Sequence, residues 1–425
     1  MAYVASTPKE PFRLSMLVYD TRYRSYTIQI VVLLLFLAFL AWLLNNTVEN
    51  LAAKDKDINF SFLFQRAGYD IDQQLIPYTN DSTHGRALFV GLLNTLIVAF
   101  FGCILATLIG VFAGVLRLSH NWVVSRLMTV YVETFRNVPL LLWIILAFVV
   151  FSETAPAPRD FRVTEEMAAA GEEPAASKIL FDSVAFTNRG ASIPRPYLDH
   201  SLGSFSVLDV PINLSVVAAL ALIAVGVWIN RRLVVHARSV QEATGVRPTI
   251  WWKSLLILFG PIIVFLYALG FHLEYPELRG FNFQGGINVA HSFTALLIAL
   301  SLYTGAFIAE AVRAGILAIS KGQTEAAYAL GLRPGRTMRL VVLPQALRVI
   351  VPPLISQYLN LTKNTTLGMA ISYLDLKGTL GGITLNQTGR ELESMLLMMA
   401  IYLVLSLIIS SGMNVYNTAM KLKER

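Results

Sequence analysis

Several side chains that could take part in chemistry lie within or beside apolar segments of the sequence. Glu133 and Arg136 are three residues apart, as are Glu310 and Arg313, so each pair would share one face of a helix. Ionisable groups inside a membrane are costly and usually mark a path, a gate or an ion pair between helices. For Glu133 and Arg136 we favour a structural or gating pair, and a substrate contact is the alternative. Glu310 and Arg313 are expected to fix the base of the polar loop that follows them.

A second candidate is the run Lys363-Asn364-Thr365-Thr366, which follows an apolar segment and precedes an expected short helix at 367–376. An interrupted membrane helix can turn free N-terminal amides toward an anionic group of a substrate. Thr365 or Thr366 would cap that helix, and Lys363 would add positive charge near a carboxylate. The alternative is that the Lys363 side chain extends to the membrane interface and binds nothing.

The sequence offers little for catalysis. Gly331 to Thr337 superficially resembles a phosphate-binding loop, but the spacing is wrong and Arg336 stands where that motif has lysine. The HExxH and GxSxG motifs of metalloproteases and serine hydrolases are also absent. Cys103 is the single cysteine, which excludes an intrachain disulfide and a cysteine metal cluster. We therefore expect no catalytic residue, no metal site and no directly bound cofactor.

The elements that must position the candidate residues are predicted to be membrane helices. The chain is 55% hydrophobic and 14% charged, whereas a soluble domain has about 25% charged residues. The net charge of +7 does not indicate nucleic acid, because the basic residues lie in short loops beside apolar segments. The fold class is an all-α polytopic membrane protein with about eight transmembrane helices. The expected spans are 28–44, 88–116, 128–151, 211–230, 251–271, 289–319, 338–361 and 395–419.

Two segments need separate interpretation. Residues 28–44 form a longer apolar run than a usual signal peptide, and no Ala-x-Ala site follows closely, so we expect an uncleaved first span. Residues 152–210 are rich in Ala, Pro, Glu and Asp and are too polar to span a membrane. They form either a small exposed module or lid, or a disordered linker.

The distribution of basic residues predicts the orientation. If the N-terminus is cytoplasmic, four segments lie on the cytoplasmic side, and all are rich in Lys and Arg. The opposite loops carry acidic residues that match or exceed their basic ones, so the positive-inside rule places both termini in the cytoplasm. The cytoplasmic segments are 117–126, 231–250, 320–337 and the C-terminal tail; the external loops are 46–87, 152–210 and 272–288.

The loop at 320–337 is predicted to contain a short helix that binds a partner. Ser320 and Gln323 fit a capping box, Gly331 is a candidate C-cap, and Pro334 prevents continuation. Such a helix, roughly 15 Å long, is not stable alone in water. It lacks the bulky apolar stripe of a helix that lies on lipid headgroups, which is the other interpretation. The small face offered to a partner would consist of Ala326, Ala327 and Ala329, with Glu325 at one end.

This loop resembles the EAA signature of ATP-binding-cassette (ABC) importer permeases. The match reads Glu325-Ala326-Ala327, three residues, Gly331, nine residues, Val341, one residue and Leu343-Pro344. In that family the segment forms the coupling helix, which docks in a groove of the ATPase subunit. The resemblance implies that a partner subunit uses the ATP and Mg. The implied coupling residues are Glu325, Ala326, Ala327, Gly331, Leu343 and Pro344.

Further motifs resemble the polar amino-acid branch of these permeases. The segment from Glu133 to Leu141 is similar to that branch's Arg-Gly-Thr-Pro-Leu-Leu element, with Asn137 and Val138 replacing Gly and Thr. The long form of the chain looks most like the larger permease subunit of bacterial general L-amino-acid importers. The other matching segments are 309–315, 322–327, 343–346, Pro352-Pro353 and 363–367.

The resemblance implies a type I importer core of five spans, interrupted by an insertion. It covers about 88–151 and 289–420. The implied organisation is 1–45, a cytoplasmic N-terminus and first helix; 46–87, a periplasmic loop; 88–151, the first part of the core; 152–288, an insertion with a periplasmic segment and an extra helix pair; and 289–425, the second part of the core, with the coupling helix at 320–337.

The implied function is the permease subunit of an ATP-driven importer for polar or broad-range L-amino acids in a bacterial inner membrane. The expected partners are ABC ATPase subunits, a second permease in a heterodimer, a periplasmic amino-acid-binding protein and the lipid bilayer, with no nucleic acid. The alternative is an ion-coupled secondary transporter of small solutes. That alternative predicts acidic residues deep in several spans, and most spans here lack them.

Overall fold

A computed structural model describes residues 15–53, 58–162, 174–207 and 210–420 of the chain. The chain forms two compact units, Met1–Phe60 and Ser61–Arg425. The first 14 residues and the basic tail at 421–425, both of which enter the predicted topology, lie outside the described residues.

The first unit consists, in its described part, of a short helix and a long one. α1 spans Met16–Tyr19 and α2 spans Thr21–Ala52. α2 is long and apolar enough to cross a membrane. Apolar side chains surround this helix on all sides, which is typical of a helix covered by lipid or by another protein.

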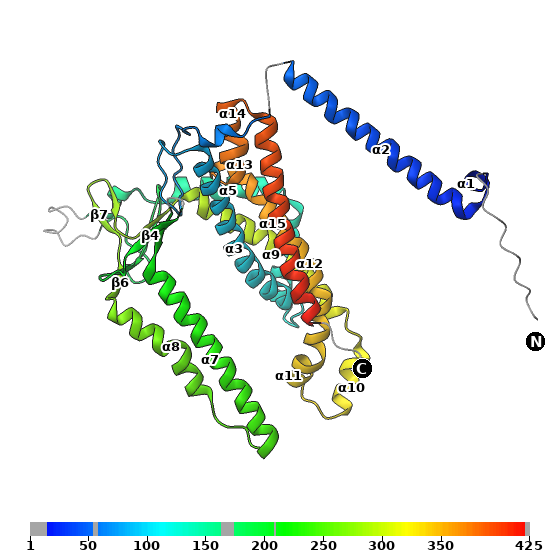
Figure 1. Cartoon of the computed structure of the whole chain (residues 1–425). Coiled ribbons are helices and arrows are strands. Elements are labelled where there is room, and N and C mark those ends of the chain that lie inside the picture. Colours follow the sequence, from blue (N-terminus) through cyan, green and yellow to red (C-terminus); the bar gives the residue numbers. More distant parts are fainter. Residues whose placement is uncertain (1–14, 54–57, 163–173, 208–209, 421–425) are drawn as a thin grey trace, which may run out of the picture. The chain divides into compact units, whose positions relative to one another are not determined.

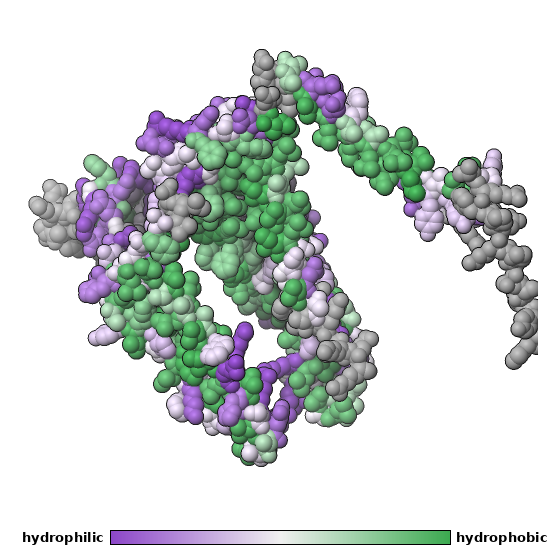
Figure 2. Space-filling view, in the orientation of Figure 1, coloured by the Kyte–Doolittle hydropathy of each residue, from purple (hydrophilic) through white to green (hydrophobic). Residues whose placement is uncertain are grey.

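The prediction of about eight membrane helices is confirmed. Among the described residues, seven helices are long and apolar enough to cross a membrane, and a bent helix pair makes an eighth. Figure 2 shows apolar residues over the long helices of the second unit, with hydrophilic residues gathered at the two ends. The long helices of the second unit are α3 (His84–Leu116), α7 (Leu214–Thr244), α8 (Trp251–Ala268), α9 (His291–Leu317), α12 (Leu343–Asn364) and α15 (Glu391–Met420).

α9 is the central helix of the core and packs closely against α3 (Figure 1). Glycines on α3 permit this close approach. An ideal Cβ on Gly110 would lie 2.6 Å from Cβ of Ile308, and one on Gly114 would lie 2.6 Å from the carbonyl oxygen of Ala309. Small residues at such positions let two helix backbones pack closely inside a membrane, where no hydrophobic effect drives helices together.

The third predicted span is not one continuous helix. It divides into α4 (Trp122–Asn137) and α5 (Leu140–Thr154), which meet at an angle of 108°. Val138 at the junction is extended, with φ −104° and ψ 135°. Pro139 explains the break, because a proline disfavours helical geometry in the residue before it and cannot donate a backbone hydrogen bond. The expectation of a single span at 128–151 is therefore corrected to a broken one.

The chain between α12 and α15 forms a compact run of short helical turns. α12 continues directly into η4 (Thr365–Ile371), and the chain then turns at Ser372, whose φ is 60°. Three short pieces follow and lie at the end of the core away from α10 and α11 (Figure 1). They are α13 (Leu376–Gly378), η5 (Thr379–Thr384) and α14 (Leu385–Thr388).

The two outer loops of the insertion pair with each other to form a small β module. The described residues of 152–210 contain β-strands, although no strand was expected there. β9 pairs antiparallel with β2, and β6 pairs with β3, so segments far apart in sequence lie side by side. The strands are β1 (Ala185–Thr187), β2 (Gly190–Ile193), β3 (Arg195–Leu198), β4 (Ser204–Val207), β5 (Val210–Asn213), β6 (Phe271–Glu274), β7 (Glu277–Arg279), β8 (Asn282–Gln284) and β9 (Ile287–Val289).

The insertion leaves the core and returns to it at nearly the same place. α5 ends at Thr154, and β9 leads within two residues into α9. The ring of Phe151 stacks on His291 at 6.3 Å, and Phe186 packs edge-on against the same imidazole at 5.5 Å. These three rings close the base of the insertion.

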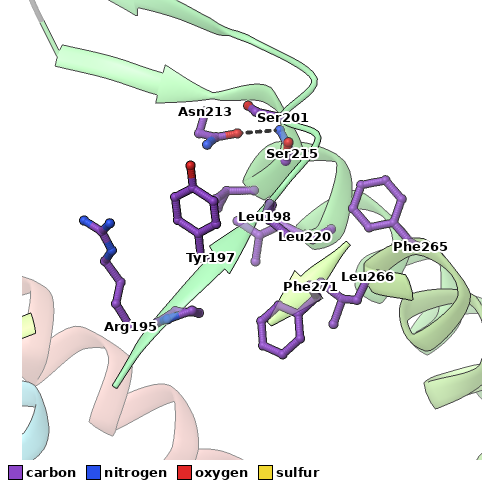
Figure 3. Close-up of a pocket in the computed structure, with 13 residues that line it drawn as sticks. Arg195, Tyr197, Leu198, Ser201, Asn213, Ser215, Leu220, Phe265, Leu266 and Phe271 are labelled. Atoms are coloured by element: carbon purple, nitrogen blue, oxygen red, sulfur yellow. Dashed lines mark hydrogen bonds between the residues drawn. The ribbon is translucent and has the colours of Figure 1, made fainter. Parts of the chain in front are cut away.

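The extra helix pair of the insertion, α7 and α8, packs chiefly on itself and on the β module. Asn213 caps α7 by accepting a hydrogen bond from the Ser215 amide at 2.8 Å. Where both helices meet the module, a cavity of about 580 Å³ has mainly apolar walls. Figure 3 shows Leu220, Phe265 and Leu266 on its helix side and Tyr197 and Phe271 on its strand side.

Candidate functional site

The loop predicted to contain the coupling helix forms a short helix, α10, which spans Lys321–Ala329. Ser320 is its N-cap residue, but its side chain makes no capping hydrogen bond in the described structure, so the predicted capping box is wrong. The Gln323 amide instead donates to the Ser320 carbonyl at 3.1 Å. This backbone turn closes the first helical turn without the side chain.

Gly331 ends α10 as predicted. Its φ of +75° is left-handed, a conformation that costs a residue with a Cβ about 1–2 kcal/mol. The Gly331 amide donates to the Tyr328 carbonyl at 2.9 Å, and the Leu332 amide donates to the Ala327 carbonyl at 3.1 Å. These two bonds form a Schellman motif, which satisfies the last carbonyls of the helix. The short helix α11 (Pro334–Thr337) and the π-helical turn η3 (Met338–Val342) then lead back to α12.

The exposed surface of α10 differs from the predicted small-residue face. Ala326 and Ala329 are exposed, but Ala327 is only 4% exposed and faces this chain's own interior. Two bulky side chains that the sequence interpretation left out, Tyr328 and Leu330, are also exposed, and Leu330 reaches 82%. The free surface is therefore a mixture of small and large apolar groups.

The remaining implied coupling residues lie on both sides of the α10 loop. Glu325 and Gly331 are exposed, and an ideal Cβ on Gly331 would meet no atom of the chain within 4 Å. Leu343 is exposed at the start of α12, and Pro344 beside it is half-buried. A short helix with exposed apolar side chains beside polar ones is suited to a binding surface.

A cluster of charged side chains joins α3, α4 and α9. Arg117, directly after α3, pairs with Glu310, and its Nη2 lies 3.7 Å from Oε1 of Glu133. Nη1 of Arg313 lies 3.1 Å from Oε1 of Glu310, so the predicted pair is confirmed. Nη1 of Arg136 lies 3.9 Å from Oε2 of the same carboxylate. Glu310 thus collects three guanidinium groups from three helical elements.

Glu133 and Arg136 are not paired with each other in the described structure. Each instead pairs across to another helix, which favours the structural or gating role over a substrate contact. The sequence interpretation missed Arg117, whose side chain is only 7% exposed. A buried guanidinium needs acidic partners to offset its lost hydration. The position of Arg117 directly after an apolar run could have indicated an ion pair. Basic residues follow many membrane spans under the positive-inside rule, however, so this position alone does not distinguish Arg117.

The run at 363–366 does not form the predicted break. Asn364 and Thr365 are both helical, with φ/ψ of −69°/−13° and −56°/−29°. Thr366 Oγ1 donates back to the Lys363 carbonyl at 2.8 Å, so this hydroxyl caps no following helix. Thr365 is buried and its hydroxyl likewise reaches back, to the Thr362 carbonyl at 3.0 Å. In the described structure residues 363–366 therefore present no free helix N-terminus, and Lys363 is exposed.

The two groups of substrate-path candidates lie at opposite ends of α9. An ideal Cβ on Gly368, just after the Lys363 run, would lie 2.7 Å from Cδ2 of Leu296. Leu296 and Glu310 are 14 positions apart on α9, which is about 20 Å along a helix. The structure therefore does not bring Glu133 and Arg136 together with Lys363.

Residues 219–421 match the family described as "Binding-protein-dependent transport system inner membrane component". The chain is 68% identical over 426 residues to the glutamate/glutamine/aspartate/asparagine transport system permease protein BztB of Rhodobacter capsulatus, covering 100% of both chains. It is 43% identical to the general L-amino acid transport system permease protein AapQ of Rhizobium johnstonii, covering 97% of this chain and 96% of that one. A third relative is BztC of Rhodobacter capsulatus, a permease protein of the same transport system as BztB. It is 37% identical over 28% of this chain and 26% of its own length.

The spans and the family match define a multi-pass membrane permease, the translocation subunit of a transporter. The full-length similarity makes the assignment more specific. The chain belongs to the amino-acid ABC transport permeases, whose members act in bacterial importers. The predicted function of the chain in ABC-type amino-acid uptake is thereby confirmed.

Proposed function

We propose that this permease imports acidic amino acids and their amides, glutamate, aspartate, glutamine and asparagine, with ATP hydrolysis supplied by partner ATPase subunits. The observation that carries the substrate class is the 68% identity to BztB across the whole of both chains. Both ATP and Mg would bind to the partner, because the present sequence has no phosphate-binding loop.

The ATPase would dock on α10. The rest of the described chain leaves part of its surface exposed, and Gly331 leaves open space at the helix end. The exposed residues are Glu325, Ala326, Ala329 and Leu330. The end of the core that carries α10 would therefore face the cytoplasm, with both termini on that side. The basic loops at this end agree with that orientation.

The β module would lie on the periplasmic side, where a binding protein delivers the amino acid. The second half of the pore would be a distinct permease. BztB and BztC are two permease proteins of one transport system, which supports a heterodimer of related subunits. α2 offers an uncovered apolar helix for such an assembly or for lipid.

Reconstitution tests the proposed function directly. Proteoliposomes containing this chain, its second permease and the ATPase should take up labelled glutamate when ATP is enclosed and the binding protein is supplied outside. Omitting the ATPase should abolish uptake. An ion-coupled transporter makes the opposite prediction: the purified chain alone would accumulate glutamate down a sodium or proton gradient.

Lys363 is proposed to add positive charge to the path taken by the substrate carboxylate. Lys363→Ala should raise the KM for glutamate uptake by about tenfold, because a charge-assisted contact contributes about 1.5 kcal/mol or more. Lys253→Ala, on α8, removes an equal charge elsewhere and should leave uptake unchanged. Wild-type uptake and wild-type glutamate-stimulated ATPase activity in Lys363→Ala would show that Lys363 only extends to the interface.

A further inference from the structure

Asp375 is a carboxylic acid buried inside the second unit, in the segment between the last two predicted spans. Its exposure is 0%, and it forms no ion pair with any cation in the described structure. A carboxyl group buried without a cation is costly unless hydrogen bonds replace its lost water. Such bonds fix its position, so the partners of Asp375 indicate what it holds in place.

The carboxyl oxygens of Asp375 contact three separate elements. Oδ1 accepts a hydrogen bond from the Gly378 amide at 2.9 Å and so caps α13. Oδ2 lies 3.2 Å from the Thr365 hydroxyl of η4 and 3.4 Å from the Tyr402 hydroxyl of α15. One side chain therefore joins the end of the α12–η4 helix, the turn that follows it and the last span.

The neighbours of Asp375 tie the same segment to α3. The Leu376 amide donates to the Thr95 hydroxyl at 3.1 Å, and the Asn94 side chain donates to the Leu374 carbonyl at 2.9 Å. The backbones of α3 and Asp375 pack closely at this contact, because an ideal Cβ on Gly91 would lie 2.8 Å from the Asp375 carbonyl oxygen. The carboxyl group of Asp375 and the backbone beside it thus join four elements of the core.

The groups that face Asp375 are neutral near pH 7. They are the hydroxyls of Thr365 and Thr95 and the phenols of Tyr402 and Tyr373. Burial raises the pKa of Asp375 from 3.8 to about 6, against the opposing effect of its hydrogen bonds. Because the folded protein holds this proton more tightly than the unfolded chain does, the stability it adds is complete below about pH 4. That stability is lost as the pH rises through about 6.

We propose that Asp375 is a positioning residue for translocation. By joining η4, α13 and α15 it holds Lys363–Thr366 in the place that the substrate path requires. This inference rests on the proposed function, because it assumes that this segment lines the path. A single amide group can replace the carboxyl group in this role, since an asparagine can accept from Gly378 and donate to Thr365.

The test compares two replacements of Asp375 in the reconstituted transporter. Asp375→Ala removes the acceptor of the Gly378 amide and the contacts with the Thr365 and Tyr402 hydroxyls, and its KM for glutamate should rise at least about tenfold. Asp375→Asn should restore the wild-type KM. Thr365→Val should raise the KM as well. Thr362→Val is the matched control. In the described structure the Thr362 hydroxyl donates to the Tyr358 carbonyl of its own helix at 2.9 Å, so the KM should not change.

Thermal denaturation gives a second readout that does not depend on transport. The melting temperature of Asp375→Asn minus that of wild type should increase between pH 5 and pH 7.5, because only the wild type must ionise a buried acid. The inference is overturned if Asp375→Asn transports no better than Asp375→Ala, or if the melting difference is flat with pH. Absence of ATP-driven uptake in the wild type would instead refute the proposed function, and the melting series would still report on Asp375.

Discussion

Gly331→Trp should abolish both co-purification of the ATPase and ATP-driven uptake while the permease still folds. The indole would project from the end of α10 into space that this chain leaves empty, since an ideal Cβ at Gly331 meets nothing within 4 Å. The proposed ATPase groove must approach this point, so a bulky group would hold the two surfaces apart. We expect the amount of ATPase recovered with the tagged permease to fall by more than tenfold.

Gly245→Trp is the matched control for this experiment. Gly245 ends α7 with a φ of +74°, and an ideal Cβ there also meets nothing within 4 Å. The two substitutions therefore impose the same backbone strain, about 1–2 kcal/mol, in the same open surroundings. Retention of the ATPase by Gly245→Trp and its loss from Gly331→Trp would locate the docking surface on α10. Equal retention by both variants would contradict docking at α10.

Gly110→Ala should strongly destabilise the core. A single methyl group at this position would lie 2.6 Å from Cβ of Ile308 and 2.8 Å from the Gly305 carbonyl oxygen. The second contact is with backbone, so no side-chain rotation relieves it and α3 must move away from α9. Overpacking of this kind typically costs about 1–3 kcal/mol. We expect a lower melting temperature in detergent and less protein in the membrane.

Gly412→Ala provides the control for the helix interior. Gly412 lies in α15, and an ideal Cβ there meets nothing within 4 Å. Alanine favours a helix by about 0.5–1 kcal/mol relative to glycine, so this variant should be neutral or slightly more stable. Equal melting temperatures for Gly110→Ala and Gly412→Ala would show that α3 and α9 are not packed as closely as the structure has them.

The sequence could predict features that depend on local composition. Long apolar runs specify the spans, because a helix must cover about 30 Å of hydrocarbon whatever it packs against. Gly331 was identifiable as the end of α10, since left-handed backbone at a helix end favours glycine. The Glu310–Arg313 pair was identifiable because residues three apart are neighbours on any helix.

Features that depend on contacts between distant segments could not be predicted in this way. The role of Arg117 follows from Glu310 on another helix, 193 positions away. The strands of the insertion are three or four residues long, so their hydrophobic periodicity could not identify them. Two of their pairings, β2 with β9 and β3 with β6, join residues more than 70 positions apart. The burial of Ala327 depends on how the chain folds back after Gly331, which the spacing of the alanines does not specify.

One local sequence pattern led to a wrong prediction, because threonine can either cap a new helix or continue the existing one. Two threonines after a lysine at 363–366 suggested a new helix, but both hydroxyls bond backward to carbonyls of the same helix. Threonine in a helix commonly bonds in this way, to a carbonyl three or four positions earlier. The chain breaks later, at Ser372, where the left-handed conformation falls on a residue that no pattern singled out.

The two ends of the insertion lie next to each other, so the chain could pass directly from α5 to α9 without it. Phe151, Phe186 and His291 bring the point where the chain departs from α5 next to the point where it enters α9. A connection of a few residues would span that distance, and the entropy of closing a loop grows only slowly with its length. We therefore expect that the extra helix pair and the β module could be removed without changing the connections of the helices around α9.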